Sequence, residues 1–311
     1  MLGSIAIYIV KRLITLFFIL LVLSIIIFFM IYMLPGDPAV LLAGPEATQA
    51  EIQMVRERLG LDKPLLEQYL IFIRKILSGN LGESIITGYP ISKLIYERFQ
   101  NTLKLAVFSL FISSILGIFA GVTAAINRNK FLDQIVMVLS LTGVSMPVFL
   151  LAIILIQIFS VWFKIFPATS VGTALEFRHI ILPALTLGLI GAAPIARITR
   201  TSMIESLSQD YITTAKSFGF HKRIIIYKYA LRNALIPVVT VMGLIFGYNL
   251  AGAVITETIF AYPGLGRLIV DSIFSRDYPV IQIGLLFITS TFVIVNIIVD
   301  ILYSLINPKI R

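Results

Sequence analysis

Apolar residues fall in about six long runs along this 311-residue chain, and polar residues are concentrated between the runs. An α-helix of about 20 apolar residues crosses the hydrocarbon core of a bilayer, because each residue adds about 1.5 Å. The runs come close to this length or exceed it, so the pattern predicts an all-α membrane protein with about six transmembrane helices. The expected spans are residues 13–33, 105–126, 135–163 (interrupted by Pro147), 181–198, 235–255 and 281–305.

The long polar segment 34–102, between the first and second spans, carries helical patterns of its own. Thr48 is followed three residues later by Glu51, which is the spacing of a capping box and predicts a helix over 47–59. Apolar residues at helical spacing predict a second helix over 65–77, which Gly79 ends, and a third over 90–98. We expect a folded cap on the outer face, which either packs around the span ends or docks a partner.

Basic residues set the expected orientation. The net charge is +9, and the charges lie between apolar runs, which indicates membrane flanks rather than a nucleic-acid surface. Lys11 and Arg12 precede a first run too long for a cleaved signal, so we expect a retained anchor helix. The short inner segments hold far more Lys and Arg than the two short outer loops, which places both termini in the cytoplasm. The predicted organisation is an anchor helix at 1–33, an extracytoplasmic helical loop at 34–102, and a core at 103–311 with five spans and a cytoplasmic loop at 197–237.

Several kinds of chemistry have no matching residues in the sequence. The chain has no cysteine and two histidines, which leaves little material for a metal or thiol site. It lacks the glycine-rich loop ending in Gly-Lys-Ser/Thr that cradles nucleotide phosphates. We therefore expect no catalytic residues, no metal and no cofactor in this chain, and no enzymatic activity. The deep spans also lack the ionisable residues of a secondary carrier; Asp300, near an inner end, is expected to form an interfacial hydrogen bond. A self-contained carrier or channel remains the alternative class.

The inner loop contains one compact helical segment. Asp210 is placed to cap a helix at its start, and Gly219 to close it in the left-handed conformation. The segment between them predicts a short, stiff helix at the membrane surface. Such a helix, anchored by a span on each side, can transmit force from an external protein; an amphipathic surface helix is the alternative.

This segment resembles the EAA loop of ABC-importer permeases, with Thr213, Thr214 and Ala215 at the Glu-Ala-Ala positions and Gly219 at the glycine. Further matching motifs lie along the whole chain, and their order is specific. They are Leu-Pro-Gly-Asp-Pro at 34–38, Leu-Gly-Leu-Asp-Lys-Pro at 59–64, Gly-Asn-Leu-Gly at 79–82, Leu-Arg-Asn-Ala-Leu-Ile-Pro at 231–237, Glu-Thr-Ile-Phe-Ala-Tyr-Pro-Gly-Leu-Gly-Arg at 257–267, Arg-Asp-Tyr-Pro at 276–279 and Asn-Pro-Lys-Ile-Arg at 307–311. Together they resemble the dipeptide/oligopeptide/nickel permease family, in particular its subunit with the long first outer loop.

The resemblance implies a type I, MetI-like bundle that forms half of the pore of an ATP-driven importer in a prokaryotic inner membrane. It implies di- or oligopeptides as cargo, with nickel or glutathione as alternatives. It also implies four kinds of partner: a second permease, two cytoplasmic ATPases that hold ATP and Mg²⁺, an extracytoplasmic solute-binding protein, and lipid. The expected ATPase-contacting residues are Tyr211, Ile212, Thr213, Thr214, Ala215, Lys216, Phe218, Gly219 and Phe220.

Two further sites are predicted with their alternatives left open. Polar residues and a helix breaker in the third span, and a polar pair in the fifth, either line the cargo pathway or pack between helices; they are Ser145, Met146, Pro147, Tyr248 and Asn249. A segment rich in glycine and proline follows the fifth span and forms either an outer gate or a tight structural turn. Its candidate residues are Glu257, Pro263, Gly264 and Gly266.

Overall fold

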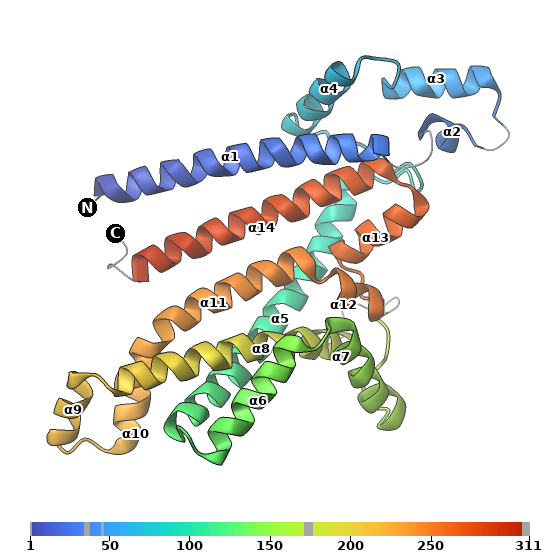
Figure 1. Ribbon diagram of the computed structural model, residues 1–311. Coiled ribbons are helices and arrows are strands. Elements are labelled where there is room, and N and C mark those ends of the chain that lie inside the picture. The colour runs from blue at the N-terminus through green and yellow to red at the C-terminus, as the bar shows by residue number, and fades with distance from the viewer. Residues whose placement is uncertain (1, 34–37, 45–46, 171–176, 307–311) are drawn as a thin grey trace. The chain divides into compact units, whose positions relative to one another are not determined.

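The computed structural model describes residues 2–33, 38–44, 47–170 and 177–306. The described chain is helical almost throughout, with a single isolated β-bridge between Glu83 and Pro90 (Figure 1). The prediction of an all-α protein is confirmed. The motif segments 34–37 and 307–311 and the side chain of Asp300 lie outside the described residues.

The fold consists of two compact units, one formed by Met1–Phe99 with Leu268–Ser290 and the other by Gln100–Arg267 with Thr291–Arg311. The helices α5, α13 and α14 contribute to both. The first unit holds α1 (Leu2–Met33), α2 (Pro38–Ala43), α3 (Gln49–Leu59), α4 (Leu65–Leu77), the start of α5 (Ile91–Ile126), most of α13 (Leu265–Ser275) and the first part of α14 (Tyr278–Ile306).

Local sequence signals account for the helices of the polar segment. The helix α3 begins at a capping box, in which Glu51 N donates to Thr48 Oγ1 and Thr48 N donates to Glu51 Oε2 at 2.7 Å. The predicted helix 65–77 is present with the predicted bounds. The predicted short helix 90–98 is wrong as a separate element, because Ile91 starts one continuous helix that runs to Ile126. No proline lies between residues 91 and 126 to divide it.

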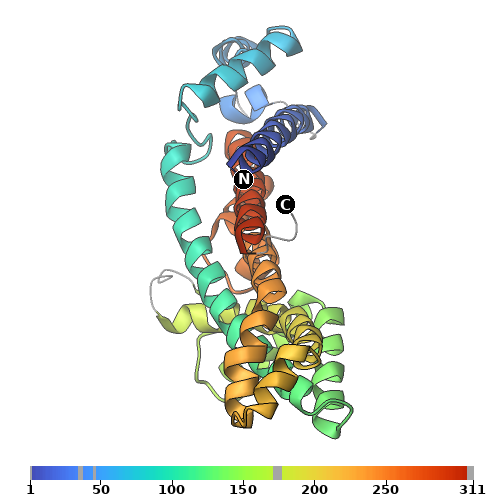
Figure 2. The same ribbon diagram turned by 90° about the vertical axis from the view of Figure 1, so that its left-hand side faces the viewer.

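The second unit is organised around α8 (Phe177–Leu207), which packs against α6 and α11 (Figures 1 and 2). Glycines also bring α5 close to α8: a Cβ on Gly117 or Gly121 of α5 would lie within 2.6 Å of α8 atoms. Close backbone approach is the common way in which helices associate in lipid. The unit also holds α6 (Phe131–Ser145), α7 (Val148–Leu155), a π-helical turn (Ile156–Trp162), α9 (Asp210–Ser217), α10 (Lys222–Ile224), a second π-helical turn (Ile225–Ala230), α11 (Leu231–Gly252) and α12 (Val254–Ile259).

Among the described residues, four helices are long and apolar enough to span a membrane: Ile91–Ile126, Phe177–Leu207, Lys222–Ala251 and Tyr278–Val299. The apolar part of α1, Ile14–Phe29, is shorter. The expected third span is not one straight helix: α6 and the helix that follows it are bent by 108°. Pro147 causes the break, because proline disfavours the helical conformation of Met146 before it, which is extended with ψ 126°.

Candidate functional site

The short helix α9 is fastened to the second unit by its own apolar side chains. Ile212 and Ala215, three positions apart, share one face and are buried in a cluster with Met203, Ile226 and Ala230. Burying a side chain of the size of Ile212 contributes about 1.5–3 kcal/mol. Both residues were expected to contact an ATPase; the structure places them in the chain's own core, where they hold α9 in position.

A hydroxyl network adds a second attachment. The phenol oxygen of Tyr211 lies 2.6 Å from Ser206 Oγ and accepts a hydrogen bond from Asn233 Nδ2 at 2.9 Å. Ser206 Oγ in turn donates to the Ala230 carbonyl at 3.0 Å. Because Ser206 belongs to α8 and Asn233 to α11, one tyrosine joins α9 to the ends of two long helices. The sequence did not indicate these partners of Tyr211.

The opposite side of α9 is open. Thr213, Thr214, Lys216 and Phe220 are exposed, and Phe218 is 76% exposed. Exposed aromatic side chains on a structured segment are typical of surfaces that contact another protein. The structure thus divides the predicted coupling residues into an anchoring set and an exposed set.

The residue that closes α9 was predicted correctly from the sequence, but the residue that caps its start was not. Gly219 has φ 73°, so the left-handed closure is confirmed. The predicted capping role of Asp210 is wrong: Gln209 occupies the cap position without a side-chain hydrogen bond, and Asp210 is the first helical residue. A carboxylate there still stabilises the helix, because the free N–H groups of the first turn carry partial positive charge.

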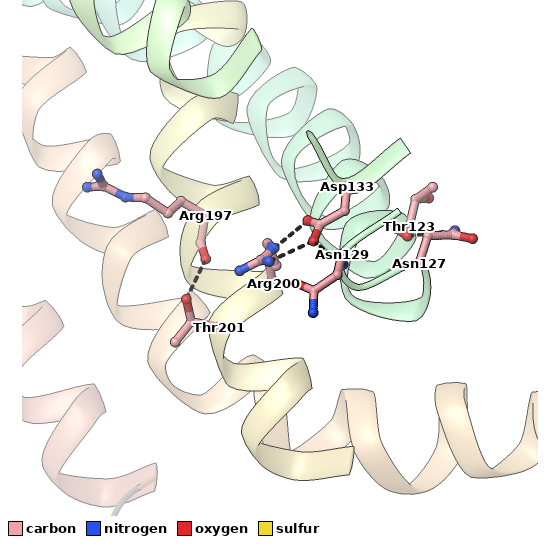
Figure 3. Close-up of polar contacts among 7 residues, drawn as sticks. All are labelled: Thr123, Asn127, Asn129, Asp133, Arg197, Arg200 and Thr201. Carbon is pink, nitrogen blue, oxygen red and sulfur yellow. Dashed lines mark hydrogen bonds and ion pairs between the residues drawn. The ribbon is translucent and has the colours of Figure 1, made fainter. Parts of the chain in front are cut away.

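An ion pair joins α6 to α8 (Figure 3). The guanidinium of Arg200 binds the buried carboxylate of Asp133 through two contacts, Nε–Oδ1 at 2.5 Å and an Nη–Oδ2 contact at 2.7 Å. The backbone N–H of Asn129 donates to the same carboxylate at 2.9 Å. The side chain of Arg197, one turn earlier on α8, extends away from Asp133 (Figure 3). Bidentate pairing of this kind fixes the relative position of two helices.

The predicted outer gate is built around a fully buried carboxylate. Glu257 on α12 is 0% exposed, and its Oε1 accepts a hydrogen bond from Thr102 Oγ1 at 2.7 Å. Its Oε2 accepts from the backbone N–H of Arg267 at 3.1 Å, and Thr102 Oγ1 accepts from Leu265 N at 2.9 Å. Glu257 and Thr102 therefore hold the first turn of α13 against α12 and α5.

Glycines make room for this carboxylate. A Cβ on Gly264 would lie 2.1 Å from Glu257 Cδ, and a Cβ on Gly266 would lie 2.8 Å from the Val254 backbone. The carbonyl of Pro263 accepts a hydrogen bond from Asn101 Nδ2 at 3.0 Å. All four predicted gate residues thus belong to one network. The partners Asn101 and Thr102 were missed, although two adjacent polar residues just before an apolar run are a signal that could have pointed to them.

Tyr262 completes the turn. Its hydroxyl donates to the Asn101 carbonyl at 3.0 Å, and the ring is fully buried. Burial first, and the negative charge of Glu257 second, raise the pKa of Tyr262 far above its ordinary value.

The predicted pathway residues do not form one cluster in the structure. Ser145, Met146 and Pro147 form the corner between α6 and α7, and Ser145 and Pro147 are exposed. Tyr248 on α11 is 66% exposed, whereas Asn249 is buried and its amide nitrogen has no hydrogen-bond partner among the described residues. Ser140, one turn before the corner, lines a cavity of about 250 Å³ between α6 and α8 with Ala193 and Arg197. The role of the five predicted residues in a cargo pathway stays a prediction.

The second unit is thus a bundle of apolar helices, with the short helix α9 attached to the ends of α8 and α11. Residues 113–311 match the family described as binding-protein-dependent transport system inner membrane component, and residues 5–106 match its N-terminal family. The chain belongs to this family: it is a permease subunit of an ABC importer and a multi-pass inner-membrane protein. The resemblance drawn from the sequence motifs is confirmed.

Curated relatives cover nearly the whole chain. It is 44% identical over 304 residues to the glutathione transport system permease protein GsiC of Escherichia coli (strain K12), with 98% of each chain covered. GsiC of Salmonella choleraesuis (strain SC-B67) matches with the same identity and coverage.

Two solved structures share the fold. The MetNI methionine ABC transporter in inward-facing conformations matches with a TM-score of 0.59 at 19% identity, covering 70% of this chain and 98% of that one. An amino acid ABC transporter with histidines matches with a TM-score of 0.51 at 16% identity, covering 69% and 92%. The predicted MetI-like bundle is confirmed.

Proposed function

We propose that this permease imports glutathione or a short peptide of similar size, driven by two cytoplasmic ATPase subunits that seat α9. The observation that carries the coupling role is the division of α9 into two sides. Ile212 and Ala215 fix it to the permease core, while Thr213, Thr214 and Phe218 are open to a partner. A helix that transmits movement from the ATPases must be fixed to the permease core and accessible to the ATPases, and α9 meets both conditions.

The hydrogen bonds of Tyr211 transmit movement of α9 to two long helices. A displacement of α9 is passed to α8 through Ser206 and to α11 through Asn233, because both side chains bond the same phenol oxygen. ATP-driven closure of the ATPases then biases a helix bundle between two arrangements, which is how a small displacement at one end produces a change at the other. The Glu257 network at the opposite end of α11 is the proposed outer gate.

The remaining partners follow from the family. A second permease completes the pore, and a solute-binding protein delivers the cargo outside the cell. ATP and Mg²⁺ bind in the ATPase subunits. Both termini of this chain lie in the cytoplasm, as the distribution of Lys and Arg indicates.

The cargo proposal is supported by the 44% identity to permeases named for glutathione transport. Isothermal titration of the cognate binding protein with glutathione, dipeptides, tripeptides and Ni²⁺ tests it. Glutathione or a short peptide should bind most tightly. Selective binding of Ni²⁺ would reassign the cargo and leave the coupling proposal intact.

Cross-linking tests the coupling helix. The chain has no cysteine, so Thr214→Cys places one thiol on the exposed side of α9. We expect it to cross-link to the ATPase in the assembled complex, with a yield that changes when ATP is added. Lys130→Cys, in the exposed turn between α5 and α6, is the control and should give far less product. Equal yields at the two positions would contradict the assignment of α9.

ATP dependence separates the importer from a carrier. Proteoliposomes with the full complex should accumulate cargo only when ATP and the binding protein are present. Uptake by the purified permease chain alone, without ATP, would replace this proposal with a secondary carrier.

A further inference from the structure

The amphipathic helix α4 is held against the side of the apolar helix α1. Tyr69 of α4 shares a hydrogen bond with Ser24 of α1 at 2.8 Å, and Ser24 is buried. The ring of Phe28 meets the rings of Tyr69 and Phe72, with centroids 5.4 and 5.7 Å apart. Ser24 and Phe28 both lie within the apolar stretch Ile14–Phe29. The contact is thus made beside the apolar stretch of α1, and not beyond its end (Figure 1).

The face of α1 that α4 covers continues as an uncovered apolar surface. Phe17 and Leu21 precede Ser24 and Phe28 at positions that share the same helical face. Phe17 is 62% exposed and Leu21 is 38% exposed. Because α1 is an apolar helix of a multi-pass permease, lipid chains are the natural cover for this surface.

A leucine stripe runs along one side of α4. Leu66, Leu70 and Leu77 are 71%, 58% and 82% exposed. Their separations of four and seven residues place them on one helical face. None of the residues of α4 is fully buried in this chain, so the stripe has no intramolecular cover.

The opposite side of α4 has a different character. Gln68, Ile71 and Lys75, roughly half a turn away from the stripe, line a cavity of about 310 Å³. Phe28 and the polar residues Asn80 and Glu83 line the same cavity. The helix therefore presents leucines on one side and lines a cavity with polar groups on the other. The residues of α4 that contact α1, Tyr69 and Phe72, lie between these two sides.

We propose that α4 lies in the membrane interface, with Leu66, Leu70 and Leu77 among the acyl chains of the bilayer. The leucine stripe extends the exposed apolar surface of α1, and the exposed basic residue Arg74 in the last turn of α4 is placed to meet lipid phosphates. An apolar face combined with basic residues is the pattern of helices that bury one side about 5–10 Å into the headgroup boundary. The partner of this surface is the bilayer, not a second protein.

The position of α4 in the membrane interface holds the polar segment 38–90 at a fixed depth relative to the bilayer. A helix anchored both to α1 and to lipid cannot rise from the membrane when other subunits bind. The first unit would then present α3 at a constant height, on the same side of the membrane as the proposed binding-protein partner.

Depth-resolved fluorescence quenching tests the proposal. Leu70→Cys and Leu77→Cys each place a single thiol on the stripe of an otherwise cysteine-free chain. Each variant is labelled with an environment-sensitive fluorophore, and the complete importer is assembled in nanodiscs. Wild-type complex treated with the same label provides the background. Ala50→Cys, on the exposed surface of the polar helix α3, is the matched control.

Phospholipids brominated on their acyl chains should remove most of the emission at residues 70 and 77 and leave residue 50 unchanged. Aqueous iodide should quench residue 50 and spare the other two. Strong quenching of residues 70 and 77 by iodide would show a water-facing stripe and overturn the proposal. Protection from both quenchers would show a protein partner and overturn it as well. Leu66→Cys provides a third position on the same face if either variant fails to assemble.

Discussion

Gly219 shows how one backbone conformation limits the choice of residue. A Cβ at this position would meet nothing within 4 Å, so the space is open. The constraint is φ 73°, where an ordinary L-residue costs about 1–2 kcal/mol. The requirement for glycine at the end of α9 is therefore conformational and not steric.

A pair of substitutions separates these two causes. Gly219→Val should weaken co-purification of the ATPase and lower ATP-driven uptake, because a β-branched residue resists the left-handed region. Gly219→Asn should retain most of both, because asparagine tolerates that region. The measurements are ATPase recovery after affinity purification and uptake into proteoliposomes. Similar losses in the two variants would indicate a steric role and count against this explanation.

Glu257 illustrates the cost of a buried carboxylate. It is tolerated because Thr102 and the N–H of Arg267 satisfy its oxygens. Removing one hydrogen-bond partner of a buried group costs about 1–3 kcal/mol, and more when the group is charged.

Thr102→Val should therefore lower the thermal unfolding midpoint of the purified complex. The substitution keeps the shape of the side chain but removes the two hydrogen bonds that Thr102 Oγ1 forms with Glu257 Oε1 and with the N–H of Leu265. Thr102→Ser keeps the hydroxyl and should behave nearly as the unmodified protein. Scanning fluorimetry of the detergent-solubilised complex measures the difference. If valine and serine give the same midpoint, the hydroxyl does not hold the turn.

Helices in the second unit are connected by a few specific polar contacts as well as by apolar packing. The ion pair between Asp133 and Arg200 joins α6 to α8 close to the start of α6 (Figure 3). Asp133 is almost fully buried while Arg200 is partly exposed, so solvent screens the pair only in part. The pair fixes one end of the helix that turns sharply at Pro147.

A double-mutant cycle measures this connection. Asp133→Asn and Arg200→Gln should each reduce unfolding stability by about 1–3 kcal/mol, since each leaves a charged partner unmatched. The double variant should lose less than the sum of the two, because both charges are then absent. Thermal unfolding of the four proteins gives the coupling energy. Additive losses would mean that the two side chains act independently.

The orientation proposed for the chain rests on its charge distribution, and two serines test it. Ser78 ends α4 and Ser217 ends α9, and both are exposed. A membrane-impermeant maleimide added to intact spheroplasts should label Ser78→Cys and leave Ser217→Cys unmodified. Opening the membrane and removing the ATPase subunits should make Ser217→Cys reactive. Labelling of Ser217→Cys in sealed spheroplasts would reverse the proposed topology.

Features that depend on near neighbours along the chain were predictable from the sequence. The capping box at Thr48 and Glu51, the helix 65–77 and the closure at Gly219 each involve residues at most a few positions apart. The apolar runs are equally local, because a span needs only consecutive residues that tolerate lipid. The family motifs could likewise be read in order along the chain.

Features that depend on packing were not predictable. The pairing of Thr102 with Glu257 joins residues 155 positions apart, and that of Asp133 with Arg200 joins residues 67 apart. No local pattern selects such partners, since the choice depends on which helices lie side by side. The division of α9 into a buried and an exposed side arises in the same way. The break at Pro147 was visible in the sequence, but the size of the turn, 108°, was not. Sequence periodicity reveals which residues favour lipid or helix, whereas the partner of each polar group depends on the three-dimensional packing of the bundle.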